Sequence, residues 1–234
     1  MRATEQEEQD EILRRMEGAG RYNARLLERM LPHLGPRVLD VGAGIGTFTE
    51  PIAAQVDSVL AAEPDTAFAE RLQARVAHLD NVRVVPALVQ DLPPEDTGFD
   101  AAICMNVLEH LPDDVAALRS FRERLAPGGR LLILVPAHPF LYGATDEAVD
   151  HQRRYASGEL RSRLASADFE ILELRHVNPV GTLGWLVSSR ILRRRLIPSG
   201  PLALYDRLVP ALRLLDALRL PVGLSLWAVA RRPG

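Results

Sequence analysis

The sequence predicts an α/β protein with a doubly wound, mostly parallel, seven-stranded sheet, N-terminal helices and a helical insertion before the last strand. Three observations predict this fold. Short, continuously apolar runs alternate with helical patterns over residues 37–135, which is typical of strands buried on both faces. A glycine-rich turn follows the first run. The chain has 234 residues, of which 47% are hydrophobic and 25% are charged, so it can bury a full core.

Two helical patterns open the chain, roughly Glu5–Glu17 and Gly20–Leu34, and glycines and prolines separate and end them. Apolar runs then predict five strands, with helical patterns between them. The expected strands are residues 37–41, 58–62, 82–85, 99–105 and 130–135, and the expected helices are residues 65–77 and 114–125.

The regularity ends after residue 136. Residues 137–157 have the composition of a long loop, residues 158–167 predict a helix, and residues 169–177 predict a strand. Two helical patterns then precede the last expected strand, residues 224–231. We therefore divide the chain into an N-terminal helical segment (1–35), a ligand-binding core (36–136), a loop, helix and strand (137–177), a cap (178–222) and a final strand (223–234). An insertion of this size usually covers an active site.

Composition excludes several classes of protein. All 28 basic residues are arginine, which excludes a lysine Schiff base and the P-loop lysine. Cys104 is the only cysteine, which excludes an intrachain disulfide and a multi-cysteine metal site. The longest stretch without a charged residue, Leu131–Thr145, is short and contains prolines, so we expect no transmembrane helix. The acidic start lacks the apolar segment of a secretory signal, which predicts a cytoplasmic protein.

Charge is distributed unevenly. Residues 1–150 contain 14 arginines and 25 acidic residues, a net of −11, whereas residues 151–234 contain 14 arginines and 6 acidic residues, a net of +8. The total of −3 argues against general nucleic-acid binding, which normally needs a strongly basic domain.

The glycine-rich turn is the most informative segment. It reads Val38-Leu39-Asp40-Val41-Gly42-Ala43-Gly44-Ile45-Gly46-Thr47 and lies between an expected strand and a helix. A dinucleotide fingerprint would have its third glycine at position 47, where this chain has Thr47 instead. The turn therefore does not match a pyrophosphate-binding loop. Glu63 follows the second strand, 23 residues after Asp40, where a carboxylate can accept both ribose hydroxyls. A nucleoside without phosphates therefore fits better than NAD. The alternative for Glu63 is a solvated carboxylate before Pro64.

Five segments in this order resemble the class I S-adenosylmethionine-dependent methyltransferases. They are VLDVGAGIGTF, AAEPD, Gln90-Asp91-Leu92, Phe99-Asp100 with CMNVLEHLPDD, and LAPGGRLLILVP, and they cover about residues 36–136. The resemblance implies a Rossmann-like fold, S-adenosyl-L-methionine as cofactor and S-adenosyl-L-homocysteine as product. It also implies that Asp40 and the backbone of Gly42 and Gly44 hold the methionine part, Glu63 the ribose, Asp91 and Leu92 the adenine, and Asn106 and Val107 the sulfonium side. Ala43, Gly46 and Pro64 are further expected cofactor-binding residues.

Three histidines are candidates for the catalytic base: His110, His138 and His151. Each lies in a segment expected at the cofactor end of the sheet, and oxygen or nitrogen acceptors usually lose a proton during methyl transfer. The alternative for Glu109-His110 is a capping or packing pair. A metal site of His138, Asp146 and His151 matches no compact ligand motif, so we predict no metal.

Candidate acceptor-binding residues follow the fifth strand. Asp146-Glu147 and Asp150-His151-Gln152-Arg153-Arg154-Tyr155 resemble a loop pattern of one branch of the family. Arginine forks could hold a carboxylate or phosphate of the acceptor, and the alternative is an internal salt-bridge network. Tyr142 lies just upstream. Tyr22 in the N-terminal helical segment and Trp185 in the cap are further candidates.

The cap contains the arginine-rich stretch Gly181–Ile197, which has four arginines and no acidic residue. It could lie on an anionic membrane, but we favour a lid or homodimer surface. A second pattern places Tyr205, Leu208, Val209, Leu212 and Leu215 on one face, with Pro210 as a boundary.

From the family resemblance and these candidate residues, we predict a methyltransferase acting on an O or N atom of a small-molecule acceptor. The alternatives are a lipid-linked acceptor at the membrane surface, a non-catalytic binding module and a dehydrogenase.

Overall fold

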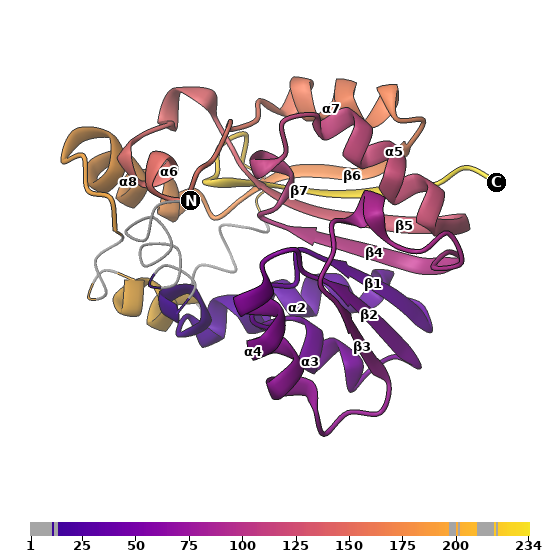
Figure 1. Ribbon diagram of the computed structural model, residues 1–234. Helices are drawn as coiled ribbons and strands as arrows, with labels where there is room; N and C mark the ends of the chain where they lie inside the picture. The colour runs from indigo at the N-terminus through magenta and orange to yellow at the C-terminus, as the bar shows by residue number, and fades with distance from the viewer. Residues whose placement is uncertain (1–10, 12–13, 197–199, 201, 210–217, 219) are drawn as a thin grey trace.

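The computed structural model describes residue 11 and residues 14–196, 200, 202–209, 218 and 220–234. These residues form a seven-stranded sheet in the order β3-β2-β1-β4-β5-β7-β6 (Figure 1). The strands are β1 (Arg37–Val41), β2 (Ser58–Ala62), β3 (Val82–Val85), β4 (Phe99–Met105), β5 (Leu125–Pro136), β6 (Glu170–Val177) and β7 (Ser225–Arg231). Neighbouring strands among β1–β5 are parallel, whereas β7 is antiparallel to both β5 and β6. The predicted fold class is therefore confirmed.

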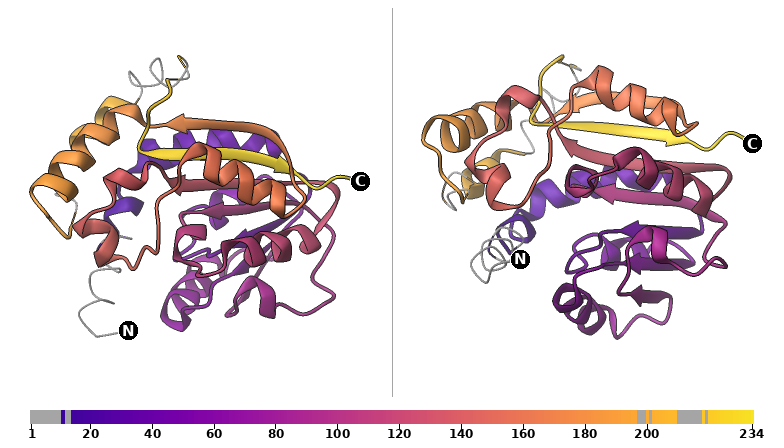
Figure 2. Two further views of the ribbon diagram at one scale, coloured as in Figure 1. Left: turned by 90° about the horizontal axis from the view of Figure 1, so that it is seen from above. Right: turned by 45° about the horizontal axis from the view of Figure 1, so that its top comes forward.

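Helices cover both faces of the sheet (Figure 2). On one face, α5 (Asp114–Arg124) and α7 (Ser157–Ser166) pack against alternate residues of the strands. On the other face lie α2 (Gly20–Met30), α3 (Thr49–Ala53) and α4 (Thr66–Val76). Because every central strand is covered twice, apolar side chains line both faces, and this explains the continuous apolar runs of the sequence.

Side chains that can accept a hydrogen bond begin two of these helices. The carboxylate of Asp65 accepts a hydrogen bond from the Phe68 N–H at 3.0 Å, and that of Asp113 accepts one from the Ala116 N–H at 2.9 Å. Such N-caps satisfy backbone donors that have no partner within the helix. They fix the points at which the chain leaves the loops at the carboxyl ends of β2 and β4.

The region after β5 contains more helix than the sequence predicts. Residues 137–157 include the turns η4 (Pro139–Leu141) and α6 (Ala144–Ala148). β5 also begins at Leu125, because Phe99 pairs with Leu125 before the register shifts to Ala101 and Arg130. The other expected strands agree with the structure to within a residue at either end.

The described part of the cap begins with α8 (Pro179–Trp185), which continues into the π-helical turn η5 (Leu186–Ile191). η5 is tied to α6 by a hydrogen bond of 3.1 Å from the Thr145 N–H to the Ser189 hydroxyl. Residues 202–209 form a further helix, and Asp206 accepts a hydrogen bond from the Tyr22 N–H at 2.9 Å. Most of the first expected helix, and Pro210, Leu212 and Leu215 of the cap, lie outside the described residues. No helix in the described part of the chain is both long and apolar enough to cross a membrane.

The strand order reverses direction at β1 and β4, which are adjacent although two strands separate them in the sequence. Ligands of open α/β sheets bind at the carboxyl ends of the strands at such a switch point. The glycine-rich turn follows β1, and the segment that begins with Asn106 follows β4, so the predicted site lies at this edge.

Candidate functional site

The turn after β1 has a backbone shape that only glycine adopts easily. Gly42, Gly44 and Gly46 have φ angles of +64°, +56° and +86°, in the left-handed region that disfavours residues with a Cβ. A Cβ on Gly42 would lie 2.4 Å from Cγ2 of Val107, whereas one on Gly44 would meet no atom within 4 Å. Gly42 therefore packs against the loop after β4, and Gly44 faces open space that a ligand can use.

Asp40 lies at the buried end of β1. Its carboxylate accepts a hydrogen bond of 2.6 Å from the hydroxyl of Thr49, which sits at the start of α3. Burial raises the pKa of Asp40 to about 7; the Thr49 hydrogen bond opposes this shift and the nearby Glu63 adds to it. Asp40 thus links the end of β1 to the start of α3 across the turn, and any positive group brought near it would favour its charged form.

Glu63 connects the glycine turn to the end of β2. One carboxylate oxygen accepts a hydrogen bond from the Gly44 N–H at 2.7 Å, and the other accepts one from the Asp65 N–H at 2.9 Å. The side chain is buried, and burial raises its pKa although both backbone hydrogen bonds lower it. Each oxygen of a carboxylate can accept more than one hydrogen bond, so both can also receive a hydroxyl group.

The other predicted cofactor residues lie along the same edge of the sheet. The Ala43 N–H donates to the Ala62 carbonyl at 3.2 Å, and the Asn106 N–H donates to the Leu134 carbonyl at 2.8 Å. Asn106 has a φ of +55° directly after β4. Pro64 is exposed beside Glu63, while Asp91 is exposed and Leu92 is buried at the turn η2 (Val89–Asp91) after β3.

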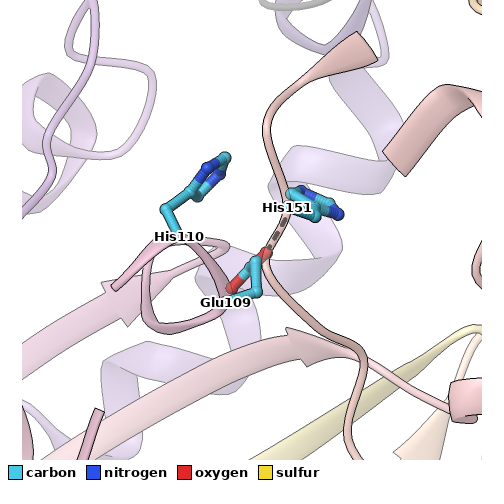
Figure 3. A group of neighbouring side chains, drawn as sticks. All are labelled: Glu109, His110 and His151. Atoms are coloured by element: carbon cyan, nitrogen blue, oxygen red, sulfur yellow. Dashed lines mark ion pairs between the residues drawn. The ribbon is translucent and has the colours of Figure 1, made fainter. Parts of the chain in front are cut away.

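Glu109, His110 and His151 form a cluster of side chains (Figure 3), and Glu109 follows Val107 by two residues in the chain. Glu109 and His110 belong to the turn η3 (Leu108–His110), and His151 follows α6 in the chain. The Nε2 atom of His151 is 3.7 Å from Oε1 of Glu109, and the rings of His110 and His151 meet edge to face with centroids 4.8 Å apart. The structure thus brings together two of the three predicted histidines, together with a glutamate that the sequence analysis treats only as a neighbour of His110.

Burial dominates the electrostatics of this cluster. It raises the pKa of Glu109 to about 7, although His151 and Arg154 lower it, and it lowers the pKa of His110 to about 4. Both shifts disfavour the charged form of the group concerned. Burial thus favours the neutral forms of Glu109 and His110.

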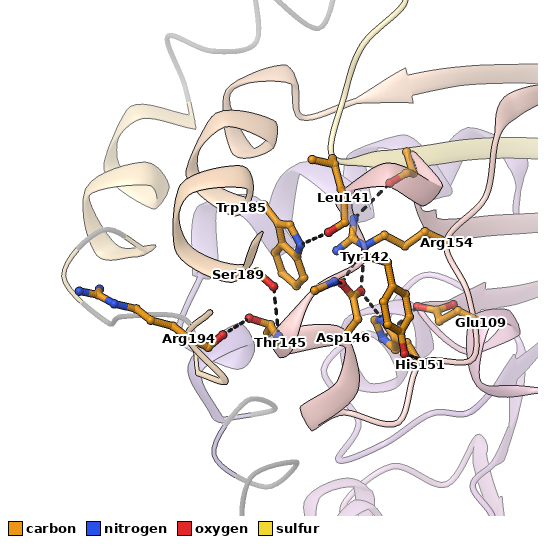
Figure 4. A network of polar contacts seen from close by, with 12 residues as sticks. Glu109, Leu141, Tyr142, Thr145, Asp146, His151, Arg154, Trp185, Ser189 and Arg194 are labelled. Atoms are coloured by element: carbon orange, nitrogen blue, oxygen red, sulfur yellow. Dashed lines mark hydrogen bonds and ion pairs between the residues drawn. The ribbon is translucent and has the colours of Figure 1, made fainter. Parts of the chain in front are cut away.

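Asp146 fixes His151 and Arg154 from the side opposite Glu109 (Figure 4). Its carboxylate lies 2.8 Å from Nδ1 of His151, and it accepts hydrogen bonds of 2.8 and 2.9 Å from Nε of Arg154. Arg154 is almost fully buried, donates to the Ala137 carbonyl at 3.1 Å and lies 4.3 Å from the centroid of the Trp185 ring. Trp185 in turn donates to the Leu141 carbonyl at 3.2 Å. Asp146 appears in the sequence pattern, but its position between His151 and Arg154 is visible only in the fold.

The other predicted acceptor residues also have partners within the protein. The hydroxyl of Tyr142 donates to the His151 carbonyl at 2.7 Å. Arg153 forms an ion pair of 3.0 Å with the buried Asp114, whose carboxylate also accepts a hydrogen bond of 2.8 Å from the Tyr155 hydroxyl. These contacts form the internal network that the sequence analysis gives as the alternative for this loop.

Two predicted residues lie apart from the Glu109 cluster. His138 stacks on His176 with centroids 4.8 Å apart, and burial followed by the charge of Arg154 lowers its pKa. Tyr22 on α2 lines a small pocket with Tyr205, Val177 and Pro179. His138 borders the network through Arg154, whereas Tyr22 contacts the helical segment 202–209.

Comparison with known proteins identifies relatives of the core. A family described as a methyltransferase domain matches residues 12–188. The ubiquinone biosynthesis O-methyltransferase of Xanthomonas oryzae pv. oryzae is 41% identical over 103 residues, which cover 42% of this chain and 42% of that protein. The tRNA U34 carboxymethyltransferase of Pseudomonas syringae pv. tomato is 32% identical over 134 residues, which cover 55% of this chain and 41% of that protein. This chain therefore spans less than half the length of either relative.

A solved structure shows the same fold along most of the chain. The 1,6-didemethyltoxoflavin-N1-methyltransferase of Burkholderia thailandensis, with bound 1,6-didemethyltoxoflavin and S-adenosylhomocysteine, superposes with a TM-score of 0.61 at 20% identity. The match covers 93% of this chain and 80% of that one. The strand order and helix layers described above are thus those of a fold that holds this nucleoside.

Proposed function

Because this chain belongs to the methyltransferase-domain family and has the class I fold with S-adenosylmethionine as its cofactor, we propose that it transfers the cofactor's methyl group to an oxygen or nitrogen atom of a small-molecule acceptor. One observation carries this proposal. The open side of Gly44 and the bridging carboxylate of Glu63 lie at the switch point of the sheet. The contact of Gly42 with Val107 joins this cradle to a polar cluster at the end of β4.

In this proposal the predicted cofactor residues keep their roles. Glu63 accepts the ribose hydroxyls, and the turn from Gly42 to Gly46 with Asp40 holds the methionine part. Asp91 and Leu92 border the adenine. Asn106 and Val107 lie at the sulfonium, next to Glu109 and His110 in the chain.

The chemistry needs alignment more than acid catalysis. The acceptor atom attacks the methyl carbon in line with the sulfur, the C–S bond breaks as the new bond forms, and S-adenosylhomocysteine leaves with the electron pair. The acceptor also loses one proton, and we assign its removal to His151 or His110, the two predicted bases that lie in the cluster. A dry, preorganised site contributes by holding the three atoms in line. The mostly buried cluster at the end of β4 is such an environment.

We place the acceptor against His110 and His151. Arg153, Arg154 and Tyr155 act as positioning residues, because their polar groups are already bonded to Asp114, Asp146 and backbone carbonyls. Tyr142, which bonds the His151 backbone, belongs with them. Tyr22, His138 and Trp185 are kept as candidates for the outer wall of the acceptor pocket.

An acceptor screen tests this function. The protein is incubated with S-adenosylmethionine and a panel of phenols, catechols, amines and tRNA, and S-adenosylhomocysteine is measured. We expect turnover with a small O–H or N–H acceptor, and strongly reduced turnover in Glu63→Ala. Turnover with tRNA alone would replace the small-molecule acceptor by a nucleic acid. Failure to bind S-adenosylhomocysteine in calorimetry would overturn the proposal.

A lipid-linked acceptor is a second candidate, and exposed apolar side chains of the cap favour it. Leu183, Val187 and Ile191 are spaced four residues apart along α8 and η5, and they are 68%, 49% and 64% exposed. Arg190, Arg193 and Arg194 lie beside them and are exposed. Such a face suits an anionic membrane surface. Co-sedimentation with vesicles containing phosphatidylglycerol at low salt tests this candidate: loss of binding in Leu183→Asp would support it, and absence of binding by the wild type would exclude it.

A further inference from the structure

The Glu109 carboxylate is the feature of the site that the methyl-transfer proposal leaves unexplained. Its side chain is fully buried, and neither oxygen accepts a hydrogen bond from another described residue. Burying a charged carboxylate without partners is strongly unfavourable. A carboxylate in such a place usually has a proton or a cation as its partner.

The neighbouring His151 ring presents a second acceptor to the same space. Its Nδ1 faces Asp146 at 2.8 Å, and two hydrogen bonds from Arg154 keep Asp146 charged and in place. In the neutral tautomer that carries its proton on Nδ1, the ring donates to Asp146, and the lone pair of Nε2 is then directed toward Glu109, 3.7 Å away. Two acceptors that face each other need a proton or a cation between them.

His110 supplies a third ligand atom on the same side. One nitrogen of each imidazole and one oxygen of Glu109 lie within 4.8 Å of one another, and this is the one such group of three among the residues that the structure describes. Ligands bound to one ion at about 2.0–2.2 Å lie about 3.4 Å apart. Small side-chain rotations therefore suffice to bring the three atoms to coordination distance.

We propose that Glu109, His110 and His151 bind one divalent transition-metal ion. Two imidazoles and one carboxylate suit Zn²⁺, Co²⁺, Mn²⁺ or Fe²⁺ better than Mg²⁺ or Ca²⁺. Asp146 acts as the outer carboxylate that orients a metal-bound histidine. The sequence analysis predicts no metal because it considers His138, Asp146 and His151, whose spacing matches no compact motif. Glu109 and His151 are 42 residues apart, and only the fold brings them together.

Three protein ligands leave at least one coordination position for water or an acceptor oxygen. The cluster begins two residues after Val107, which contacts Gly42 of the cofactor turn. An ion there would hold a hydroxyl-bearing acceptor and favour the loss of its proton. This second step rests on the proposed function, whereas ion binding does not.

Metal titration of the apo protein tests the site. The full chain is treated with a chelator and titrated with Co²⁺ and Zn²⁺, and absorption and calorimetry report geometry, stoichiometry and affinity. We expect one ion per chain in the wild type. Glu109→Gln and His151→Asn each remove a direct ligand, so we expect them to weaken binding by about 100-fold or more. Asp146→Asn should weaken binding about 10-fold, since it loses only the outer partner. His78→Gln, at an exposed histidine, is the matched control.

Two outcomes separate this inference from the proposed function. Binding that is equally weak in the wild type and in Glu109→Gln overturns the metal site, and methyl transfer that persists in excess chelator leaves the function standing without it. Tight binding of one ion in a protein that fails to bind S-adenosylhomocysteine supports the metal site and overturns the function. Thermal unfolding of each apo variant shows whether it is folded. If Glu109→Gln does not fold, the ion affinity of Asp146→Asn, expected to be about 10-fold weaker than that of the wild type, tests the site instead.

Discussion

At the scale of single residues, Asp40 makes stability depend on pH. Its pKa is about 7 in the folded protein against an ordinary value of 3.8. Between these values the folded protein keeps a proton that the unfolded chain has lost, so stability falls as pH rises from about 4 to 7. Above pH 7 the cost reaches on the order of 2 to 4 kcal/mol.

Asp40→Asn should remove this dependence, because an amide mimics the protonated acid and its carbonyl can still accept the Thr49 hydrogen bond. We expect the apo variant to be more stable than the wild type at pH 8, with a difference that shrinks steadily as the pH is lowered to 4. Urea unfolding at several pH values measures it, with the exposed Asp57→Asn as control. A difference that is constant with pH would contradict the assignment.

Glu63 gives a second prediction at this scale. In Glu63→Gln the amide NH₂ replaces an oxygen that now accepts a backbone N–H from Gly44 or Asp65, and one ribose acceptor is lost. We expect affinity for S-adenosylhomocysteine to fall by about 1 to 3 kcal/mol, measured by calorimetry. The exposed Glu70→Gln on α4 should leave the isotherm unchanged, and an unchanged isotherm in Glu63→Gln itself would remove the ribose assignment.

At the scale of elements, the sequence predicts what is local. Parallel strands that are buried on both faces have continuous apolar runs, so the bounds of the strands between Arg37 and Met105 could be predicted accurately. The helix α6 has five residues, too few for a periodic pattern. The antiparallel direction of β7 could not be predicted, because a run of buried residues has the same pattern in a parallel and in an antiparallel strand. The glycine turn and Glu63 lie close in sequence and could be predicted, whereas Glu109 meets His151 only through a contact between segments 42 residues apart. The bonds of Asp146 to His151 and Arg154 span only five and eight residues, but they depend on an irregular loop whose shape no periodic pattern predicts.

The packing of the loop after β1 on the loop after β4 can be tested at Gly42. Gly42→Ala adds a Cβ only 2.4 Å from Val107 at a positive φ, and Gly44→Ala adds one at a positive φ with no atom within 4 Å. We expect Gly42→Ala to destabilise the apo protein by about 1 to 3 kcal/mol more than Gly44→Ala. The double variant with Val107→Ala should recover part of this loss. Equal urea midpoints for the two glycine variants would show that the loops are not in contact.

Gly44→Ala should act instead on the ligand. Because Gly44 faces open space at the turn, its Cβ would occupy room that the cofactor needs, as the glycine turns of nucleotide sites require close backbone approach. We expect a larger loss of S-adenosylhomocysteine affinity in Gly44→Ala than its loss of stability accounts for. Calorimetry on the folded variant separates the two effects, and wild-type affinity would place the cofactor elsewhere.

At the scale of the whole molecule, Arg154 joins parts of the chain that the sheet alone does not connect. It bonds the Ala137 carbonyl after β5, the Asp146 carboxylate on α6 and the face of Trp185 on α8. Together with the Thr145–Ser189 hydrogen bond, this buried guanidinium connects the segment after β5 to the described part of the cap. If the acceptor binds where we propose, we expect Arg154 to couple stability to acceptor binding without touching the acceptor.

Arg154→Leu should expose this coupling. It leaves the buried Asp146 carboxylate without the guanidinium that pairs with it, which typically costs about 3 to 5 kcal/mol. The double variant with Asp146→Leu should regain part of that loss, because the Asp146 carboxylate is then removed as well. Urea unfolding measures both, and hydrogen exchange should show lost protection in α6 and α8 before the central strands. The exposed pair of Arg231 and Glu170 provides the control, since Arg231→Leu should cost about 1 kcal/mol or less. Equal costs for Arg154→Leu and Arg231→Leu would mean that the acceptor side is held by other contacts.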